Sequence, residues 1–225
     1  MFIGHYGIAL AAKRLAPRAS LGTLILAAEF VDALWPVFLM TGIEYVRIAP
    51  GITRVSPLDF YDYPISHSLL TDIGWAAAFG LIYYAVRRYA RGAWVAAALV
   101  LSHWFLDALV HRPDMPVTPH GPTVGVGLWN SVAATVAVEG GLLVLGLVLY
   151  LRMTKARDGI GRWAFWTLIV LLTAIWAGSL RGLPPPSLRA LEWSALSLWI
   201  TVPWAWWADR HRDARRTSAR PAATS

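Results

Sequence analysis

Apolar runs of close to 20 residues recur along this chain, and their repetition constrains its fold more than any other feature. The runs cover residues 2–16, 21–43, 65–86, 93–110, 128–151, 163–180 and 187–207. Each of the longer runs can cross a hydrocarbon core about 30 Å thick as a helix. The runs are rich in Ala and Leu and lack the alternation that is typical of strands. The sequence therefore predicts an all-α, polytopic membrane helix bundle with about six to seven transmembrane helices.

Composition agrees with one membrane domain and gives no sign of a soluble one. Hydrophobic residues make up 57% of the 225-residue chain, above the roughly 45–50% of an ordinary soluble domain. We expect residues 1–208 to form a single transmembrane helical domain. Residues 209–225 are basic and then small and polar. They predict a disordered cytoplasmic tail, because they offer too few apolar side chains to bury.

The positions of lysine and arginine indicate how the helices are oriented. Fifteen of the 20 fall in alternate loops, namely Lys13, Arg14, Arg18, Arg87, Arg88, Arg91, Arg152, Lys155, Arg157, Arg162, Arg210, Arg212, Arg215, Arg216 and Arg220. Cytoplasmic loops carry such an excess, so we place these loops and the C-terminus in the cytoplasm, in a multi-pass protein of the plasma or inner membrane. Seven crossings result if the run 2–16 also spans. The net charge of +7 is then explained by topology, and we expect the lipid bilayer as partner, with no nucleic acid.

Six carboxylates and two histidines lie inside the apolar runs. They are Glu29, Asp32, Asp72, Asp107, Glu139, Glu192, His67 and His103. A charge at membrane depth costs at least a few kcal/mol, so chains keep such groups where partners, water or a metal compensate. The chain has no cysteine. Any metal must therefore be held by His, Asp and Glu, a ligand set that suits zinc, manganese or iron.

The strongest local pattern runs from Ser102 to His111. Residues four apart on a helix lie about 40° apart around its axis, so His103, Asp107 and His111 line one stripe. His103 and Asp107 can give one nitrogen and one oxygen to a single ion. A His–Asp hydrogen bond that joins helices is the alternative. His111 precedes Arg112 and a proline, so we expect it to end the helix.

A second pattern surrounds His67. Pro64 suits the first turn of a helix, so His67 is expected to enter the membrane while Asp62 stays in the preceding loop. Capping of the helix by Ser66, with a buried His67, is an equal alternative.

Two further positions offer carboxylates at membrane depth. Glu29 and Asp32 lie on one helix face, where one is a candidate ligand and the other its hydrogen-bonded support. Glu139 is a candidate for the same site. For each of these acids, an interhelical hydrogen bond is the alternative.

Together these motifs resemble the membrane-bound metal-dependent hydrolases, a group distantly like the zinc-dependent phospholipase C and P1 nuclease superfamily. The resemblance lies in Gly4-His5, an acid in the next helix, Ser66-His67-Ser68-Leu69 and the later His-x-x-x-Asp, and covers roughly residues 4–150. It implies a divalent metal, Zn or Mn, with ligands at His5, Asp32, His67, His103 and Asp107. The chain departs from the family where Asp62 replaces the family's first His and Ser66 replaces Thr.

These patterns predict a membrane-embedded, metal-dependent hydrolase that acts on a phosphoester or an ester. The depth of the site suggests a lipid or lipid-linked substrate. Asp62 or Glu139 would act as the general base or hold the water. An ion- or proton-coupled permease is the alternative, because intramembrane acids and histidines can form a relay. A non-catalytic structural membrane protein, joined by polar side chains, is a third.

Overall fold

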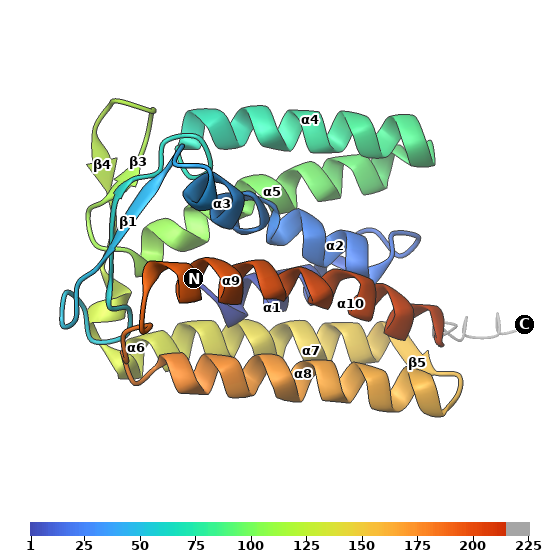
Figure 1. Cartoon of the computed structure of the whole chain (residues 1–225). Coiled ribbons are helices and arrows are strands. Elements are labelled where there is room, and N and C mark those ends of the chain that lie inside the picture. The colour runs from blue at the N-terminus through green and yellow to red at the C-terminus, as the bar shows by residue number, and fades with distance from the viewer. Residues whose placement is uncertain (215–225) are drawn as a thin grey trace, which may run out of the picture.

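The computed structural model describes residues 1–214 as a helix bundle whose long helices run between the same two ends (Figure 1). In chain order the α-helices are α1 (Ile3–Ala12), α2 (Leu21–Ala28), α3 (Phe30–Met40), α4 (Leu69–Arg87), α5 (Ala90–Val110), α6 (Val132–Thr135), α7 (Gly141–Met153), α8 (Gly159–Ser179), α9 (Leu188–Ser197) and α10 (Thr201–Arg210). Turns of other helix types are η1 (Leu128–Asn130), the π-helical η2 (Val136–Gly140) and η3 (Leu198–Ile200). The strands form antiparallel pairs: β1 (Tyr45–Ile48) with β2 (Leu58–Asp62), β3 (Met115–Pro116) with β4 (Thr123–Val124), and β5 (Thr154–Ala156) with β6 (Arg212–Ala214).

Four helical segments within residues 1–214 are long and apolar enough to cross a membrane. They are Leu69–Arg87, Ala90–Val110, Val132–Met153 and Gly159–Ser179. Helices α2 and α3 meet the same test only as a pair, bent by 56° at a short break, which brings the number to five. The helical class is thus confirmed. The expected spans at 2–16 and 187–207 do not meet this test, so six to seven transmembrane helices stay a prediction.

The segment before α4 differs from the prediction in two ways. Residues 44–64, which connect the predicted helical runs 21–43 and 65–86, contain the β1–β2 hairpin. Helix α4 begins at Leu69, and Ser68 caps it by accepting a hydrogen bond from the backbone N–H of Thr71. Ser68 is therefore the N-cap, as its short polar side chain allows, instead of Ser66. His67 lies in the turn that precedes the helix.

The predicted start of a disordered tail at residue 209 is wrong. Helix α10 continues to Arg210, and β6 pairs with β5 beyond it. The side chain of Asp209 is hydrogen-bonded to other parts of the bundle, an order that composition alone does not reveal. The rest of the predicted tail, 215–225, lies outside the residues that the structure describes.

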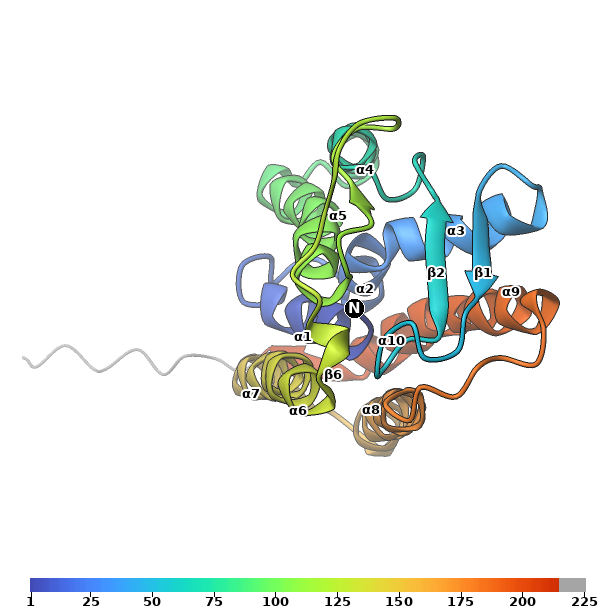
Figure 2. The same cartoon turned by 90° about the vertical axis from the view of Figure 1, so that its left-hand side faces the viewer.

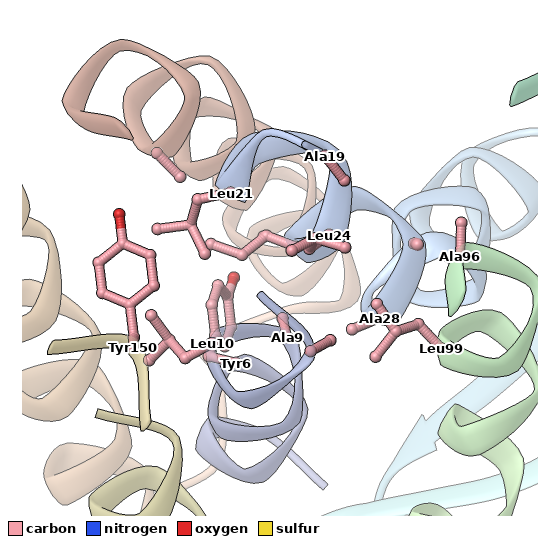
Figure 3. Packing of buried hydrophobic residues seen from close by; sticks show 14 of the residues in the cluster. Tyr6, Ala9, Leu10, Ala19, Leu21, Leu24, Ala28, Ala96, Leu99 and Tyr150 are labelled. Atoms are coloured by element: carbon pink, nitrogen blue, oxygen red, sulfur yellow. The ribbon is translucent and has the colours of Figure 1, made fainter. Parts of the chain in front are cut away.

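Helix α2 is surrounded by other helices in the middle of the bundle. Figure 3 shows its side chains between α1 and α5, with Leu24 toward α1 and Ala28 beside Leu99 of α5. Helices α1 and α7 also pack closely, because a Cβ atom at Gly7 or Gly146 would overlap the facing backbone. Small residues permit such close approach between membrane helices. The contact fixes α1, which carries His5, against the rest of the bundle.

The two ends of the bundle differ in character. The basic loops, which follow α1, join α4 to α5, join α7 to α8 and follow α10, lie together at one end (Figure 1, right). We call it the basic end. The opposite end carries the β1–β2 and β3–β4 hairpins, and we call it the hairpin end. Seen from that side, the N-terminus lies near its centre (Figure 2).

Candidate metal centre

Five side chains singled out by the sequence meet at the hairpin end of the bundle. We call them the His–Asp cluster: His5 from α1, Asp32 from α3, His67 from the turn before α4, and His103 and Asp107 from α5. They form two overlapping groups that share His103, and within each group the potential ligand atoms lie within 4.8 Å of one another. Four of the side chains are buried, whereas that of Asp32 is 35% exposed. The structure thus brings the five together; their role as metal ligands stays a prediction.

His103 has the hydrogen bonding expected of a metal ligand. Its Nδ1 lies 2.7 Å from the carbonyl oxygen of Ala28, and a carbonyl can only accept, so Nδ1 donates. The Nε2 lone pair then lies 3.4 Å from Asp107 Oδ2 and 3.7 Å from Asp32 Oδ2. This buried nitrogen has no hydrogen-bond partner among the described residues. Histidines that bind metals hold their second nitrogen in the same way, with the ligating nitrogen left free.

His67 is held by a chain of hydrogen bonds that the sequence analysis missed. The Ser66 hydroxyl donates to Glu44 Oε2 over 2.6 Å and accepts from His67 Nδ1 over 2.6 Å. Glu44 Oε1 also accepts from the backbone N–H groups of Ile65 and Ser66. His67 Nε2 therefore faces Asp32 Oδ1, 3.2 Å away. Glu44 lies outside the long apolar runs, and its distance in sequence from His67 matches no helical repeat. Its contact with Ser66 is therefore visible only in the folded structure.

His5 contacts Oδ1 of Asp107, the carboxylate oxygen that does not face His103 Nε2. Its Nε2 is 3.0 Å from Asp107 Oδ1, and its ring stacks on that of His103 with centroids 3.8 Å apart. The amino group of Met1 forms a buried ion pair with the same oxygen, Oδ1. The other oxygen, Oδ2, faces His103 and, at 3.8 Å, His67. Asp107 Oδ2 therefore faces the Nε2 atoms of His103 and His67, whose Nδ1 atoms already donate hydrogen bonds elsewhere.

Glu139 positions the helix that carries His5. It lies in the π-helical turn η2 and is buried. Its Oε2 accepts hydrogen bonds from the backbone N–H groups of Phe2 and Ile3, at 3.0 and 3.1 Å. These are among the N–H groups that a helix leaves free at its start. The contact makes Glu139 a positioning residue, and its predicted role as general base stays a prediction.

Asp62 lies apart from the cluster. It is the exposed last residue of β2, and its backbone pairs with Tyr45 across the hairpin. Within residues 1–214, no hydrogen bond or ion pair joins its carboxylate to the five side chains. Closeness in sequence to His67 suggested a general base, but the turn between β2 and α4 separates the two. The structure therefore does not bring Asp62 into the site.

His111 borders Asp107 from the loop side. It is the C-cap of α5, as its position before a proline suggested. Its Nδ1 lies 3.0 Å from Asp114 Oδ1, and its Nε2 lies 3.8 Å from Asp107 Oδ2. Burial lowers the pKa of the His111 imidazole, so the ring is neutral near pH 7. His111 adds another nitrogen lone pair beside the cluster.

The Met1 amino group pairs with Asp107 Oδ1, but the groups around Asp107 Oδ2 and Asp32 include more acceptors than donors. If the rings of His67 and His103 are neutral, their Nε2 lone pairs face carboxylate oxygens, and buried acceptors without a donor are unfavourable. Protons on both rings would relieve this, but they would place two positive charges in rings whose centroids are 5.4 Å apart. One divalent ion would instead bind both lone pairs and the carboxylates. This N/O donor set suits zinc or manganese.

A comparison with known proteins does not extend this picture. No protein-family model matches the chain, and no match was found among curated proteins or solved structures. The likeness to metal-dependent hydrolases therefore rests on the motifs of the sequence, and stays a prediction.

Proposed function

We propose that this chain is a membrane-embedded, metal-dependent hydrolase that cleaves a phosphoester or ester bond of a lipid. One observation carries the proposal: the buried Nε2 of His103 lies between Oδ2 of Asp32 and Oδ2 of Asp107 and has no hydrogen-bond partner among the described residues. A divalent cation satisfies this set of acceptors better than protons do. A second support is that the site lies at one end of a bundle with four to five helices that could cross a membrane.

The proposal includes a topology. We propose that α1 and the broken helix α9–α10 complete seven crossings, with the basic end in the cytoplasm and the hairpin end outside. The clustering of the basic loops at one end supports this orientation, because cytoplasmic loops carry the excess of Lys and Arg. Reporter fusions after Arg88 and after Asp114 test it. We expect a cytoplasmic signal from the first and an external signal from the second; the reverse pattern would contradict the orientation.

The chemistry proposed for the site is hydrolysis. A bound divalent ion lowers the pKa of a coordinated water toward neutrality and polarises a phosphoryl or acyl oxygen. In the overall reaction the water oxygen bonds to the phosphorus or acyl carbon, the ester bond to the alcohol breaks, and one water proton ends on the alcohol oxygen. Asp32 is the cluster side chain with the largest exposure, at 35%. We therefore propose that the substrate reaches the site past Asp32.

The test compares His103→Ala with His120→Ala, an exposed histidine in the loop of the β3–β4 hairpin. Each protein is purified in detergent after growth with added zinc and manganese, and its bound metal and its hydrolysis of para-nitrophenyl esters and phosphodiesters are measured. We expect the unaltered protein and His120→Ala to keep metal and activity, and His103→Ala to lose both. Full activity in His103→Ala would overturn the proposal.

A non-catalytic structural role is the second candidate, and a specific contact favours it. The buried ion pair between the Met1 amino group and Asp107 joins the start of the chain to α5, as a polar joint between helices would. Under this role the purified protein holds no metal. The permease alternative has less support, because the polar side chains of the cluster gather at one end and do not step across the bundle.

A further inference from the structure

A cavity of about 700 Å³ lies beside the His–Asp cluster, between the α2–α3 pair and α9–α10. Asp32 belongs to both the cluster and the wall of the cavity, and Glu29 lines the same wall. Most of the remaining wall is made of apolar side chains from α2, α3, α9, η3 and α10. A molecule in this cavity would therefore touch the cluster with one end and hydrocarbon with the rest.

Three of the other polar side chains of the wall are already paired, whereas the indole N–H of Trp35 is buried without a hydrogen-bond partner among the described residues. The Tyr6 and Thr201 hydroxyls lie 3.3 Å apart and hydrogen-bond to each other. The indole N–H of Trp199 donates to the carbonyl oxygen of Ala33. In contrast, Oε1 of Glu29 is buried and has no hydrogen-bond partner among the described residues. Glu29 and Asp32 are the acidic side chains of the wall, and both lie at its cluster side.

The cavity reaches the side surface of the bundle and continues along it. Trp199 and Ile200 in its wall are 48% and 59% exposed. A second cavity of about 450 Å³ shares Leu26 and Phe30 with the first and extends to Arg87 at the basic end. The two apolar cavities thus lie next to each other along α2. In a bilayer they would follow one another along the direction of the lipid chains.

We propose that the larger cavity binds the hydrocarbon chain of a lipid ester and places its scissile group at Asp32. The inference rests on the proposed function, because it names the substrate class of the same site. Size supports it: the volume falls within the range of roughly 300–1,000 Å³ for pockets that bury most of a ligand. A short-chain ester would leave most of the apolar wall without contact. The cavity would therefore favour substrates with long chains.

The test uses alkyl para-nitrophenyl phosphodiesters and para-nitrophenyl acyl esters with chains from butyl to dodecyl. The unaltered protein should show kcat/KM rising by up to about fourfold for each added methylene until the cavity is filled. Ala195→Trp places a bulky ring in the cavity wall. We expect the ratio of dodecyl to butyl kcat/KM to fall at least tenfold in this variant, with its bound metal kept. Leu34→Trp, on the opposite wall, should behave alike.

The matched control is Ala77→Trp, on an exposed position of α4 that lines neither cavity. It should keep the full chain-length dependence. Equal rates for all chain lengths in the unaltered protein, or unaltered dodecyl hydrolysis in both cavity variants, would overturn the inference.

Binding of a dansyl-labelled fatty acid separates this inference from the proposed function. If the protein holds no metal and cleaves none of the substrates, the proposed function fails. The cavity inference still predicts saturable binding of the probe that Ala195→Trp weakens at least tenfold and Ala77→Trp leaves unchanged. Probe binding that is equal in all three proteins would overturn the inference on its own.

Discussion

Two of the buried polar clusters formed by residues 1–214 lie near opposite ends of the bundle, and they are built on different principles. At the basic end, Asp209 accepts hydrogen bonds from Lys13 Nζ at 2.7 Å, from the Tyr150 hydroxyl at 2.7 Å and from the backbone N–H of Leu21 at 3.0 Å. Lys13 also donates to the carbonyl oxygen of Ala19. Every acceptor there meets a donor. At the hairpin end, lone pairs of imidazole rings meet carboxylates.

This difference shows how to distinguish a polar joint, meaning a set of hydrogen-bonded side chains that holds helices together, from a cation site. A joint is complete when its donors and acceptors match, because each buried polar group is then satisfied. A cluster with an excess of acceptors is complete only with a cation. We therefore propose different roles for the two aspartates, Asp209 and Asp107, although both are buried in ion pairs.

Replacement of Asp107 by Asn should have the largest effect on metal binding. The change removes one carboxylate oxygen and a negative charge from the centre of the cluster and adds an N–H donor there. We expect metal affinity to fall by more than about 100-fold, beyond the 10–100-fold that is typical when an outer partner of a ligand is lost. Competition with a chromogenic chelator measures it. An unchanged affinity would show that Asp107 is a joint like Asp209.

The same substitution at the other end, Asp209→Asn, should act on stability alone. It leaves Lys13, whose side chain is 12% exposed, without its charged partner. Breaking a buried ion pair in this way costs about 3 kcal/mol, so the free energy of unfolding and the midpoint of thermal unfolding in detergent should fall. Bound metal should be the same as in the unaltered protein. A loss of metal would mean that the two ends are not independent.

Glu44→Gln sharpens the comparison at the hairpin end. The amide would turn a donor toward Ser66, or toward the backbone N–H groups that the carboxylate now accepts from. We expect metal affinity to fall by about 10–100-fold, as is typical for partners that orient a metal-bound histidine. Glu192→Gln, on α9 and outside the cluster, is the matched control and should bind metal normally. Equal affinities in the two variants would remove Glu44 from the site.

Ser20→Ala should have the smallest effect. Ser20 caps α2 near the basic end by accepting a hydrogen bond from the backbone N–H of Thr23 at 3.1 Å. Loss of such a cap typically costs about 1 kcal/mol. Thermal unfolding should shift slightly, with no change in bound metal. A change in metal content would show that α2 transmits effects along the bundle to the cluster.

Much of the helical fold could be predicted from the sequence, because long apolar runs and alternating basic loops are local signals. The break at Glu29 was not predictable in this way, since α2 and α3 form one apolar run. The β1–β2 hairpin and the ordered segment up to Ala214 were missed for a different reason. Each depends on the pairing of two strands, which helical periodicity does not record.

The candidate site shows the same division. The His103–Asp107 stripe follows from helical spacing alone, and the polar residues of the apolar runs indicated Asp32 and His67. The motif resemblance added His5, and the structure places all three beside the stripe. Asp62 was suggested because it lies near His67 in the sequence. The turn before α4 separates the two residues in the structure. Glu44 was missed because its contacts with Ser66 join separate segments.

Metal analysis of the purified, full-length protein tests the central claim most directly. The protein is grown and purified in detergent with zinc and manganese present, dialysed without chelator, and its metal content is measured by mass spectrometry beside Asp107→Asn and Asp209→Asn. The account predicts at least one tightly bound metal ion per chain in the unaltered protein and in Asp209→Asn, and close to none in Asp107→Asn. A metal-free unaltered protein would contradict it, and would make the His–Asp cluster a polar joint between helices.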